Sequence, residues 1–158
     1  MESIADKANA LHATGSNCAQ SVLCAFTDQL GLDFVTAHRY ATCLGSGFGR
    51  RQLVCGAVSG GALALGAALG NDSGADLETK EKCYAVVSRF IATIEAEFGS
   101  SDCSSLLGVD LDTASGRAEV KAKGLDVSVC GRIIGRSAEL VQGYIAEALS
   151  SHETRGAR

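Results

Sequence analysis

Apolar side chains recur with helical spacing along most of this chain. The clearest case is the segment that follows Cys55, where they recur at i, i+4, i+7 and i+11: Val58, Ala62, Leu65 and Leu69. Gly70 comes next and is expected to end this helix in a left-handed conformation, which glycine adopts without a Cβ clash. The uncharged run from 53 to 69 is shorter than the roughly 20 residues that cross a membrane, so it predicts a buried helix and no membrane insertion.

The same spacing predicts helices in the rest of the chain. We expect them over 3–12, between Asn17 and Gly31, between Asp33 and Gly45, between Asp76 and Gly99, from Cys103, over 114–123 and after Ser128. The long helix after Asp76 places several apolar side chains along one face: Leu77, Tyr84, Val87, Ile91, Ile94 and Phe98. The last helix is expected to bury another set: Ile133, Ile134, Ala138, Val141, Ile145 and Leu149.

Capping residues mark where several of these helices begin and end. Asn17 and Gln20 have the spacing of a capping box, and Ser128 is expected to cap the last helix. No segment alternates between apolar and polar residues as a strand does. We therefore predict an all-α protein, a single compact domain over residues 1–158 with about six or seven helices, whose polar end, 150–158, is expected to fray.

Composition narrows the class of protein. Hydrophobic residues make up 46% of the chain and charged residues 20%, with a net charge of −4. This balance is typical of a soluble globular protein and argues against nucleic-acid binding, which needs a basic face. The first residues lack the basic and apolar regions of a secretory signal, so we expect a cytoplasmic protein. Faces rich in glycine and alanine allow close helix packing and make a homodimer plausible.

Seven cysteines in a reducing compartment indicate metal or redox chemistry rather than structural disulfides. Four of them fall at predicted helix starts: Cys18, Cys55, Cys103 and Cys130. The positive end of the helix dipole favours a thiolate there, so their pKa values are expected to lie below the ordinary cysteine value. The other three fall inside predicted helices and are expected to be small buried side chains without chemistry: Cys24, Cys43 and Cys83.

The residues around Cys55 suggest how a cofactor or anionic substrate could be bound there. Gly56 and Gly60 lie one turn apart and would let another backbone or a bulky inorganic group come close. Arg50 and Arg51 could neutralise thiolates or hold an anionic substrate, although a solvated loop explains them equally well. None of the cysteines has C-x-x-C spacing, which argues against a thioredoxin-like dithiol and a zinc ribbon.

These motifs resemble the redox-active protein family that is named for its spaced cysteines, C-GCAxxG-C-C. The matching stretches are 17–23, Gly45-Ser46-Gly47-Phe48-Gly49, Val54-Cys55-Gly56-Ala57-Val58-Ser59-Gly60, Phe98-Gly99, Cys103 with 106–108, Asp110-Leu111, Gly116-Arg117 and Cys130. The resemblance implies that the four family cysteines are Cys18, Cys55, Cys103 and Cys130, and that the protein has a redox or metal role. One stretch departs from the pattern, because Arg50-Arg51-Gln52-Leu53 stands where the family has a longer glycine run.

Three functions follow from these observations. In the first, Cys18, Cys55, Cys103 and Cys130 bind a metal centre, with an iron–sulfur cluster ahead of other thiolate-bound metals, for electron transfer or redox sensing with an unidentified redox partner. In the second, a metal-free thiol–disulfide enzyme uses two of the four, with Cys55 and Cys18 as its catalytic residues. The third is a structural zinc site in a binding module.

Overall fold

The structure is a computed structural model that describes residues 2–156, with side chains described for residues 2–151. All of its regular elements are helices or helical turns, and the described chain contains no strand. The α-helical segments are α1 (Ile4–Ala13), α2 (Cys18–Ala25), α3 (Thr27–Leu30), α4 (Phe34–Ala41), α5 (Gly45–Phe48), α6 (Gly56–Leu69), α7 (Leu77–Phe98), α8 (Cys103–Leu107), α9 (Ala114–Lys123) and α10 (Arg132–Gly156). A 3₁₀ turn, η1 (Thr42–Leu44), and a π-helical turn, η2 (Asp126–Gly131), complete the set. The prediction of an all-α fold is confirmed.

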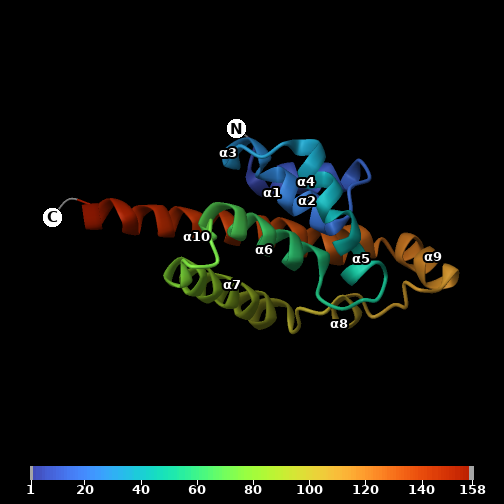
Figure 1. The fold of residues 1–158 in the computed structure, drawn as a ribbon. Helices are drawn as coiled ribbons and strands as arrows, with labels where there is room; N and C mark the ends of the chain where they lie inside the picture. The colour runs from blue at the N-terminus through green and yellow to red at the C-terminus, as the bar shows by residue number, and fades with distance from the viewer. Residues whose placement is uncertain (1, 157–158) are drawn as a thin grey trace.

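Helix α6 lies in the middle of the molecule, with α2 and α4 on one side of it, α7 on the other and α10 behind (Figure 1). The largest fully buried side chains come from these central helices and from Phe26, which directly follows α2: Phe26, Phe90, Leu65, Ile94, Ile133 and Ile134. Burying one such side chain contributes roughly 1.5–3 kcal/mol, so this apolar contact between helices is the main source of stability. Two bidentate ion pairs on the surface, Arg89 with Glu147 and Arg136 with Glu97, join α7 to α10.

At several of the capping residues in the sequence, the helix begins or ends at the predicted position. The capping box of Asn17 and Gln20 forms, Asp76 caps α7 through the Thr79 N–H, and Gly99 ends α7 in a left-handed conformation. At the end of α6 the prediction is wrong, because Gly70 is extended (φ −72°, ψ 164°) and not left-handed.

Two predicted helices are interrupted in the structure. The helix after Asn17 breaks at Phe26, which separates α2 from α3, and the helix after Asp33 ends at Ala41 and continues as the 3₁₀ turn η1. Helix α10 continues to Gly156, into the segment that was expected to fray, and residues 157–158 lie outside the described chain.

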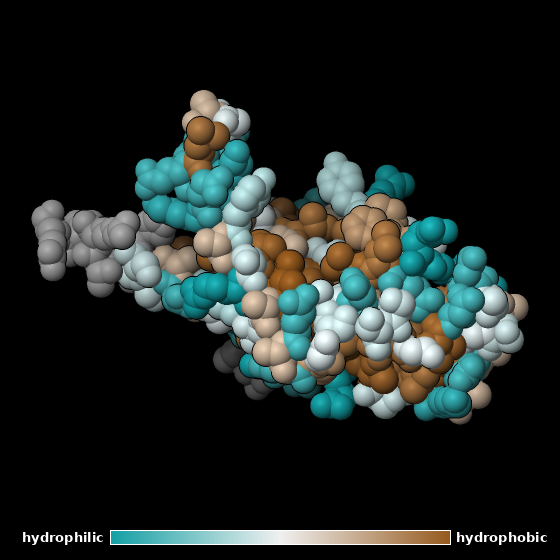
Figure 2. Space-filling view, turned by 90° about the horizontal axis from the view of Figure 1, so that it is seen from below, coloured by the Kyte–Doolittle hydropathy of each residue, from teal (hydrophilic) through white to brown (hydrophobic). Residues whose placement is uncertain are grey.

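Some apolar side chains that were placed on a common helix face are exposed. Leu77 is 57% exposed, Tyr84 61% and Leu149 57%, so Leu149 does not belong to the buried face of α10. Ile94 is buried as expected, and Val87, Ile91 and Phe98 are half-buried against the core, but the other fully buried positions of α7 are Cys83 and Phe90. Apolar side chains gather in patches on the side of the molecule where α7 lies (Figure 2).

Candidate redox centre

Cys18 is the first residue of α2, and the cap before it holds that helix start in place. The Gln20 N–H donates to Asn17 Oδ1 (2.9 Å), and the Asn17 N–H donates to Gln20 Oε1 (2.8 Å). Asn17 Nδ2 also donates to the Thr42 carbonyl (3.0 Å), and Gln20 Nε2 donates to Thr42 Oγ1 (2.9 Å). The start of α2 is therefore tied to the turn that follows α4, which fixes the position of Cys18.

Cys55 is the N-cap of α6, directly before its first turn as the sequence predicts, and it is buried (7% exposed). Its carbonyl accepts hydrogen bonds from the N–H groups of Val58 (2.9 Å) and Ser59 (3.0 Å). Gly56 brings this helix start against Cys18, since a Cβ atom on Gly56 would lie 3.0 Å from Cys18 Cβ. A larger residue at 56 would push the two cysteine-bearing segments apart.

A short antiparallel pairing brings the Cys103 segment beside the Cys55 segment. Val54 and Asp102 form an isolated β-bridge. The Cys55 N–H donates to the Ser101 carbonyl (2.8 Å), and the Cys103 N–H donates to the Leu53 carbonyl (2.7 Å). These backbone hydrogen bonds join two helix starts that are 48 residues apart in the chain. Because they use only main-chain atoms, they do not depend on which side chains stand at these positions.

Cys130 does not lie in the first turn of α10, and Ser128 does not cap that helix. Both residues lie inside the π-helical turn η2, and α10 begins only at Arg132. A π-helical turn is rare and is found frequently at functional sites, because its wider winding changes the direction of a side chain.

Electrostatics place the four family cysteines within reach of one another. The pKa of Cys18 is raised well above its ordinary value, first by a hydrogen bond with Cys130, then by burial, and then by the charges of Cys130, Cys55 and Cys103. Burial, followed by the charges of Cys55 and Cys130, raises the pKa of Cys103 to about 12. The structure therefore brings together four thiols that come from four separate segments.

The helix starts were expected to lower the pKa values of these thiols, and this prediction is wrong for three of the four. Burial raises the pKa of Cys55 despite the N–H groups of Ala57 and Val58, which act in the opposite direction. The pKa values of Cys18 and Cys103 are raised as well. Only the pKa of Cys130 is lowered, chiefly because the Cys18 thiol hydrogen-bonds to its sulfur. Burial therefore destabilises the thiolate more than the dipole of one helix stabilises it.

Sequence reasoning missed Gln52, which connects three segments beside the centre. Its side chain donates to the Val109 carbonyl (2.8 Å) and accepts from the Leu111 N–H (2.9 Å). A hydrogen bond from the same side chain acts to lower the pKa of Cys103. The partners lie more than fifty residues away, so no local pattern could have shown this role.

The segment that leads to Gln52 includes α5, whose backbone is a left-handed turn and not a right-handed helix. Positive φ values run from Ser46 (54°) through Phe48 (65°) to Arg50 (72°), with Gly47 and Gly49 between them. Each non-glycine residue in this conformation costs on the order of 1–2 kcal/mol. Gln52 N–H bonds to the Ser46 carbonyl (3.2 Å) and Leu53 N–H bonds to the Gly47 carbonyl (3.0 Å), which hold the turn closed. Backbone strain of this kind is concentrated at functional sites.

The four residues that the sequence suggested for cofactor binding lie in two different environments. Gly60 packs against the backbone of α2, since a Cβ atom there would lie 2.4 Å from the Ala19 carbonyl oxygen. Gly56 faces Cys18 and the backbone of α2, so both glycines serve close packing of two helices. Arg50 and Arg51 are exposed, and neither contributes to the pKa shifts of the described cysteines.

The three remaining cysteines lie outside this group. Cys24 and Cys83 are buried in α2 and α7, as expected, and burial raises the pKa of Cys24 to about 11. For Cys43 the prediction is wrong: it lies in the 3₁₀ turn η1, its side chain is exposed, and its thiol contacts the Tyr40 carbonyl (3.7 Å).

Four thiols form a soft donor set, the kind that Zn²⁺, Cu⁺ and iron–sulfur clusters prefer, and the Asp126 carboxylate also acts on Cys130. Over the part of the chain that the structure describes, no three His, Cys, Asp or Glu side chains are placed to hold one metal ion. Sulfurs around a single tetrahedral ion lie about 3.8 Å apart, given metal–sulfur bonds of about 2.3 Å. The chemistry of the donor set thus fits a thiolate-bound centre, whereas its present spacing does not fit a single ion.

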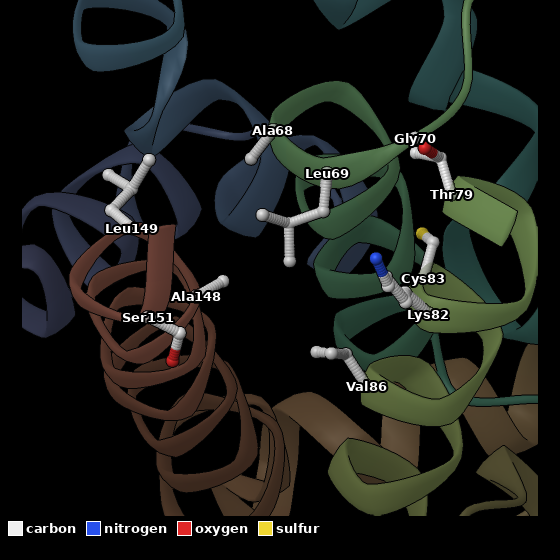
Figure 3. Close-up of a pocket in the computed structure, with 10 residues that line it drawn as sticks. All are labelled: Ala68, Leu69, Gly70, Thr79, Lys82, Cys83, Val86, Ala148, Leu149 and Ser151. Atoms are coloured by element: carbon white, nitrogen blue, oxygen red, sulfur yellow. The ribbon is translucent and has the colours of Figure 1, made fainter. Parts of the chain in front are cut away.

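An apolar cavity of about 480 Å³ lies at the other end of α6, between α6, α7 and α10 (Figure 3). Leu69, Val86 and Ala148 point into it from three helices, and Cys83 lines it from α7. None of the four family cysteines lines this cavity. Within the described residues, no helix has the length and apolarity to cross a membrane.

Comparison with known proteins gives one match. The sequence profile of the family described as "Putative redox-active protein (C_GCAxxG_C_C)" matches residues 16–144, which includes all four family cysteines. No curated protein and no solved structure matches the chain. Because the profile covers most of the sequence, the chain belongs to the C-GCAxxG-C-C family of redox-active proteins.

Proposed function

We propose that this protein is a redox protein whose four family cysteines, Cys18, Cys55, Cys103 and Cys130, hold an iron–sulfur cluster for electron transfer or redox sensing. The contacts that bring these cysteines together support the proposal most directly: Gly56 packs on Cys18, backbone hydrogen bonds pair the Cys55 and Cys103 segments, and Cys18 hydrogen-bonds to Cys130. The pKa of Cys18 agrees, because each of the other three thiols shifts it. Charge–charge interaction falls with distance, so a sulfur that responds to three others lies among them.

The centre has a deficit of positive charge that a metal would relieve. None of the groups that shift the pKa values of the four thiols is a lysine, arginine or histidine. Four neutral thiols can share this space, but four thiolates repel one another in a buried environment. Metal ions bind cysteine as the thiolate, so metal binding and loss of the thiol protons would be linked.

Family membership favours a cluster over a single zinc ion. A set of four thiolates suits either kind of centre, so the choice depends on redox chemistry. Zn²⁺ has no redox chemistry, whereas the family is redox-active. When bound, an iron–sulfur cluster supplies reversible electron transfer at a potential that hydrogen bonds to the cysteine sulfurs adjust.

The residues of this chain have distinct parts in that function. The four thiolates would hold the centre, and Gly56 keeps the Cys18 and Cys55 segments close enough to share it. Gln52 would donate a hydrogen bond to the Cys103 sulfur, which makes it a residue that adjusts the reduction potential. Its additional bonds to Val109 and Leu111 keep that amide in position.

The test is anaerobic purification followed by visible absorption, iron and acid-labile sulfide analysis. We expect iron and sulfide in the stoichiometry of a cluster, and absorption that is lost on reduction or exposure to air. Zinc alone, with no sulfide, would contradict the proposal and support a structural metal site, which should then be required for folding.

The second candidate function, metal-free thiol–disulfide exchange, is favoured by the Cys18–Cys130 hydrogen bond. This bond lowers the pKa of Cys130 and raises that of Cys18, as in a pair made of one attacking thiolate and one resolving thiol. The Cys130 thiolate would attack a disulfide of a partner protein, and the partner's first thiolate would leave. Cys18 would then lose its proton and attack the Cys130 sulfur, which releases the second thiolate. The partner disulfide is reduced and Cys18–Cys130 is oxidised.

This candidate differs in its pair from the sequence prediction, which named Cys55 and Cys18. Its test is disulfide mapping of protein that carries no metal, after oxidation and again after dithiothreitol. A reversible Cys18–Cys130 disulfide would favour thiol–disulfide exchange over the iron–sulfur cluster. Four free thiols after oxidation would exclude it.

A further inference from the structure

The hydroxyl of Ser137, on α10, is buried without a hydrogen-bond partner. Its side chain has no exposed surface, and within the described part of the chain Ser137 Oγ is the only buried side-chain nitrogen or oxygen that lacks a partner. An unpaired buried hydroxyl is unfavourable, because it has given up its hydrogen bonds to water and gained none in the protein. A role at a redox centre and an enclosed water are two explanations for such a group.

Other hydroxyls in the helices of this protein donate to their own backbone. Ser21 Oγ donates to the Asn17 carbonyl (2.8 Å), four residues earlier, and Thr93 Oγ1 donates to the carbonyl at the same spacing (2.9 Å). This bond satisfies a hydroxyl inside a helix without any other partner. Ser137 has the Ile133 carbonyl at the same spacing but makes no hydrogen bond to it. Its hydroxyl therefore stays available to another acceptor.

The packing of α6 against α10 places Ser137 beside the start of α6. The two helices run in the same direction (Figure 1) and are in contact, since a Cβ atom on Gly61 would lie 3.2 Å from Val141 Cγ2. Ala57 and Ser137 each precede these contacting residues by four positions, which is one helical turn on both helices. Both are fully buried. The register therefore brings the Ser137 hydroxyl to the first turn of α6.

The first turn of α6 also contacts the Cys55 sulfur. A hydrogen bond from the Ala57 N–H acts to lower the pKa of Cys55, although burial raises that pKa overall. A protonated thiol is a weak acceptor, whereas a thiolate accepts strong charge-assisted hydrogen bonds. The free thiol of Cys55 therefore offers Ser137 little, and a metal-bound thiolate would offer it much more. A serine hydroxyl reaches a new acceptor by rotation about χ1 alone.

We propose that Ser137 donates a hydrogen bond to the Cys55 sulfur in the loaded redox centre and thereby raises its reduction potential. This inference rests on the function proposed above. A hydrogen-bond donor stabilises negative charge on sulfur, and the reduced form of a cluster carries more negative charge than the oxidised form, so the donor favours reduction. Ser137 would then act at Cys55 as Gln52 acts at Cys103.

The test compares Ser137→Ala with Ser21→Ala, which removes an equally buried hydroxyl that has a partner. Iron content and the midpoint potential of the anaerobically loaded full chain are measured first. We expect Ser137→Ala to keep its iron but to have a lower midpoint potential, so that the ratio of reduced to oxidised protein at a fixed potential falls roughly three- to tenfold. Ser21→Ala should stay within about twofold of the wild type.

Urea unfolding of the metal-free proteins is the second measurement. Ser137→Ala loses no hydrogen bond and should unfold at the wild-type urea concentration or above it, whereas Ser21→Ala should unfold at a lower one. A lower urea midpoint for Ser137→Ala would overturn the proposal, because its hydroxyl would already have a partner such as a water. Iron with an unchanged potential in Ser137→Ala would overturn this inference alone, and a wild-type protein without iron would overturn the proposed function as well.

Discussion

The two halves of α6 use the same kind of residue in opposite ways. In the first half, Gly56 and Gly60 lack a side chain because α2 occupies that space, and this contact brings Cys18 beside Cys55. In the second half, Gly66 lacks a side chain although the space beside it is empty. A glycine-rich apolar helix can therefore position a reactive group inside the molecule at one end and offer a surface at the other. The difference is visible only in three dimensions.

The cysteines follow the same division. The four family cysteines surround the first half of α6, where they share charges and a hydrogen bond. Cys83 lies beside the second half and responds only to burial. The four family cysteines differ from Cys83 in having other thiols as neighbours, because all five are at least partly buried.

Gly60→Ala should have the largest effect on stability, because its neighbour is the backbone of α2 and cannot rotate away. The new Cβ atom would lie 2.4 Å from the Ala19 carbonyl oxygen. We expect a loss of about 2–3 kcal/mol in the free energy of unfolding, measured by urea denaturation. An unchanged midpoint would show that α2 and α6 are not packed as closely as described.

Cys24→Ser should cost about 1 kcal/mol, since Cys24 is fully buried and a hydroxyl there would lack a partner. Cys43→Ser is the matched control, because Cys43 is exposed and should tolerate the change within about 0.5 kcal/mol. Neither variant should change bound metal. Loss of metal from Cys24→Ser would mean that Cys24 takes part in metal binding, which contradicts the set of four ligands.

Gly66→Ala should act in the opposite direction from Gly60→Ala. Alanine should raise the free energy of unfolding by up to about 1 kcal/mol, because nothing opposes its helix propensity. Thermal or urea unfolding measures this directly. Destabilisation would show that the space beside Gly66 is filled by the chain itself.

Local chemistry explains which parts of the fold could be predicted from the sequence. The cap at Asn17, the helix end at Gly99 and the position of Cys55 before α6 depend on neighbouring residues, and all three are found. The positions of Cys18, Cys55 and Cys103 at helix starts could also be predicted, whereas the use of these three and Cys130 as one ligand set stays a prediction. Exposure on α7 was misjudged, since its apolar residues lie on two faces and only packing selects the buried one.

Features that depend on distant contacts could not be predicted. The left-handed turn over 46–50 is held by bonds to Gln52 and Leu53, and Gln52 is itself anchored to a loop more than fifty residues away. The π-helical turn that carries Cys130 has no propensity signal. The pKa directions of three of the four family thiols were predicted wrongly because the depth of burial is a property of the whole fold.

The smallest effect that we predict is the acid sensitivity of the Glu97–Arg136 pair, which joins α7 to α10. Hydrogen bonds from the Arg136 guanidinium lower the pKa of the Glu97 carboxyl. A carboxyl whose pKa is lowered by folding stabilises the protein above its unfolded pKa of about 4.3, and the contribution is lost as the pH falls through the folded value.

Glu97→Gln should therefore destabilise the protein slightly at neutral pH and hardly at all at about pH 3. Urea unfolding of both proteins across this range gives the comparison. A difference that grows as the pH falls would contradict the direction of the Glu97 pKa shift.

The central claim is that four cysteines around the start of α6 form one redox centre, and Cys55→Ser compared with Cys83→Ser tests it most directly. Both cysteines are buried, but only Cys55 has other thiols beside it. Visible absorption and metal content should be measured on anaerobically purified protein, with circular dichroism as the check on folding. We expect Cys55→Ser to lose absorption and metal while keeping its helices, and Cys83→Ser to keep both. Equal metal content in the two variants would contradict the account.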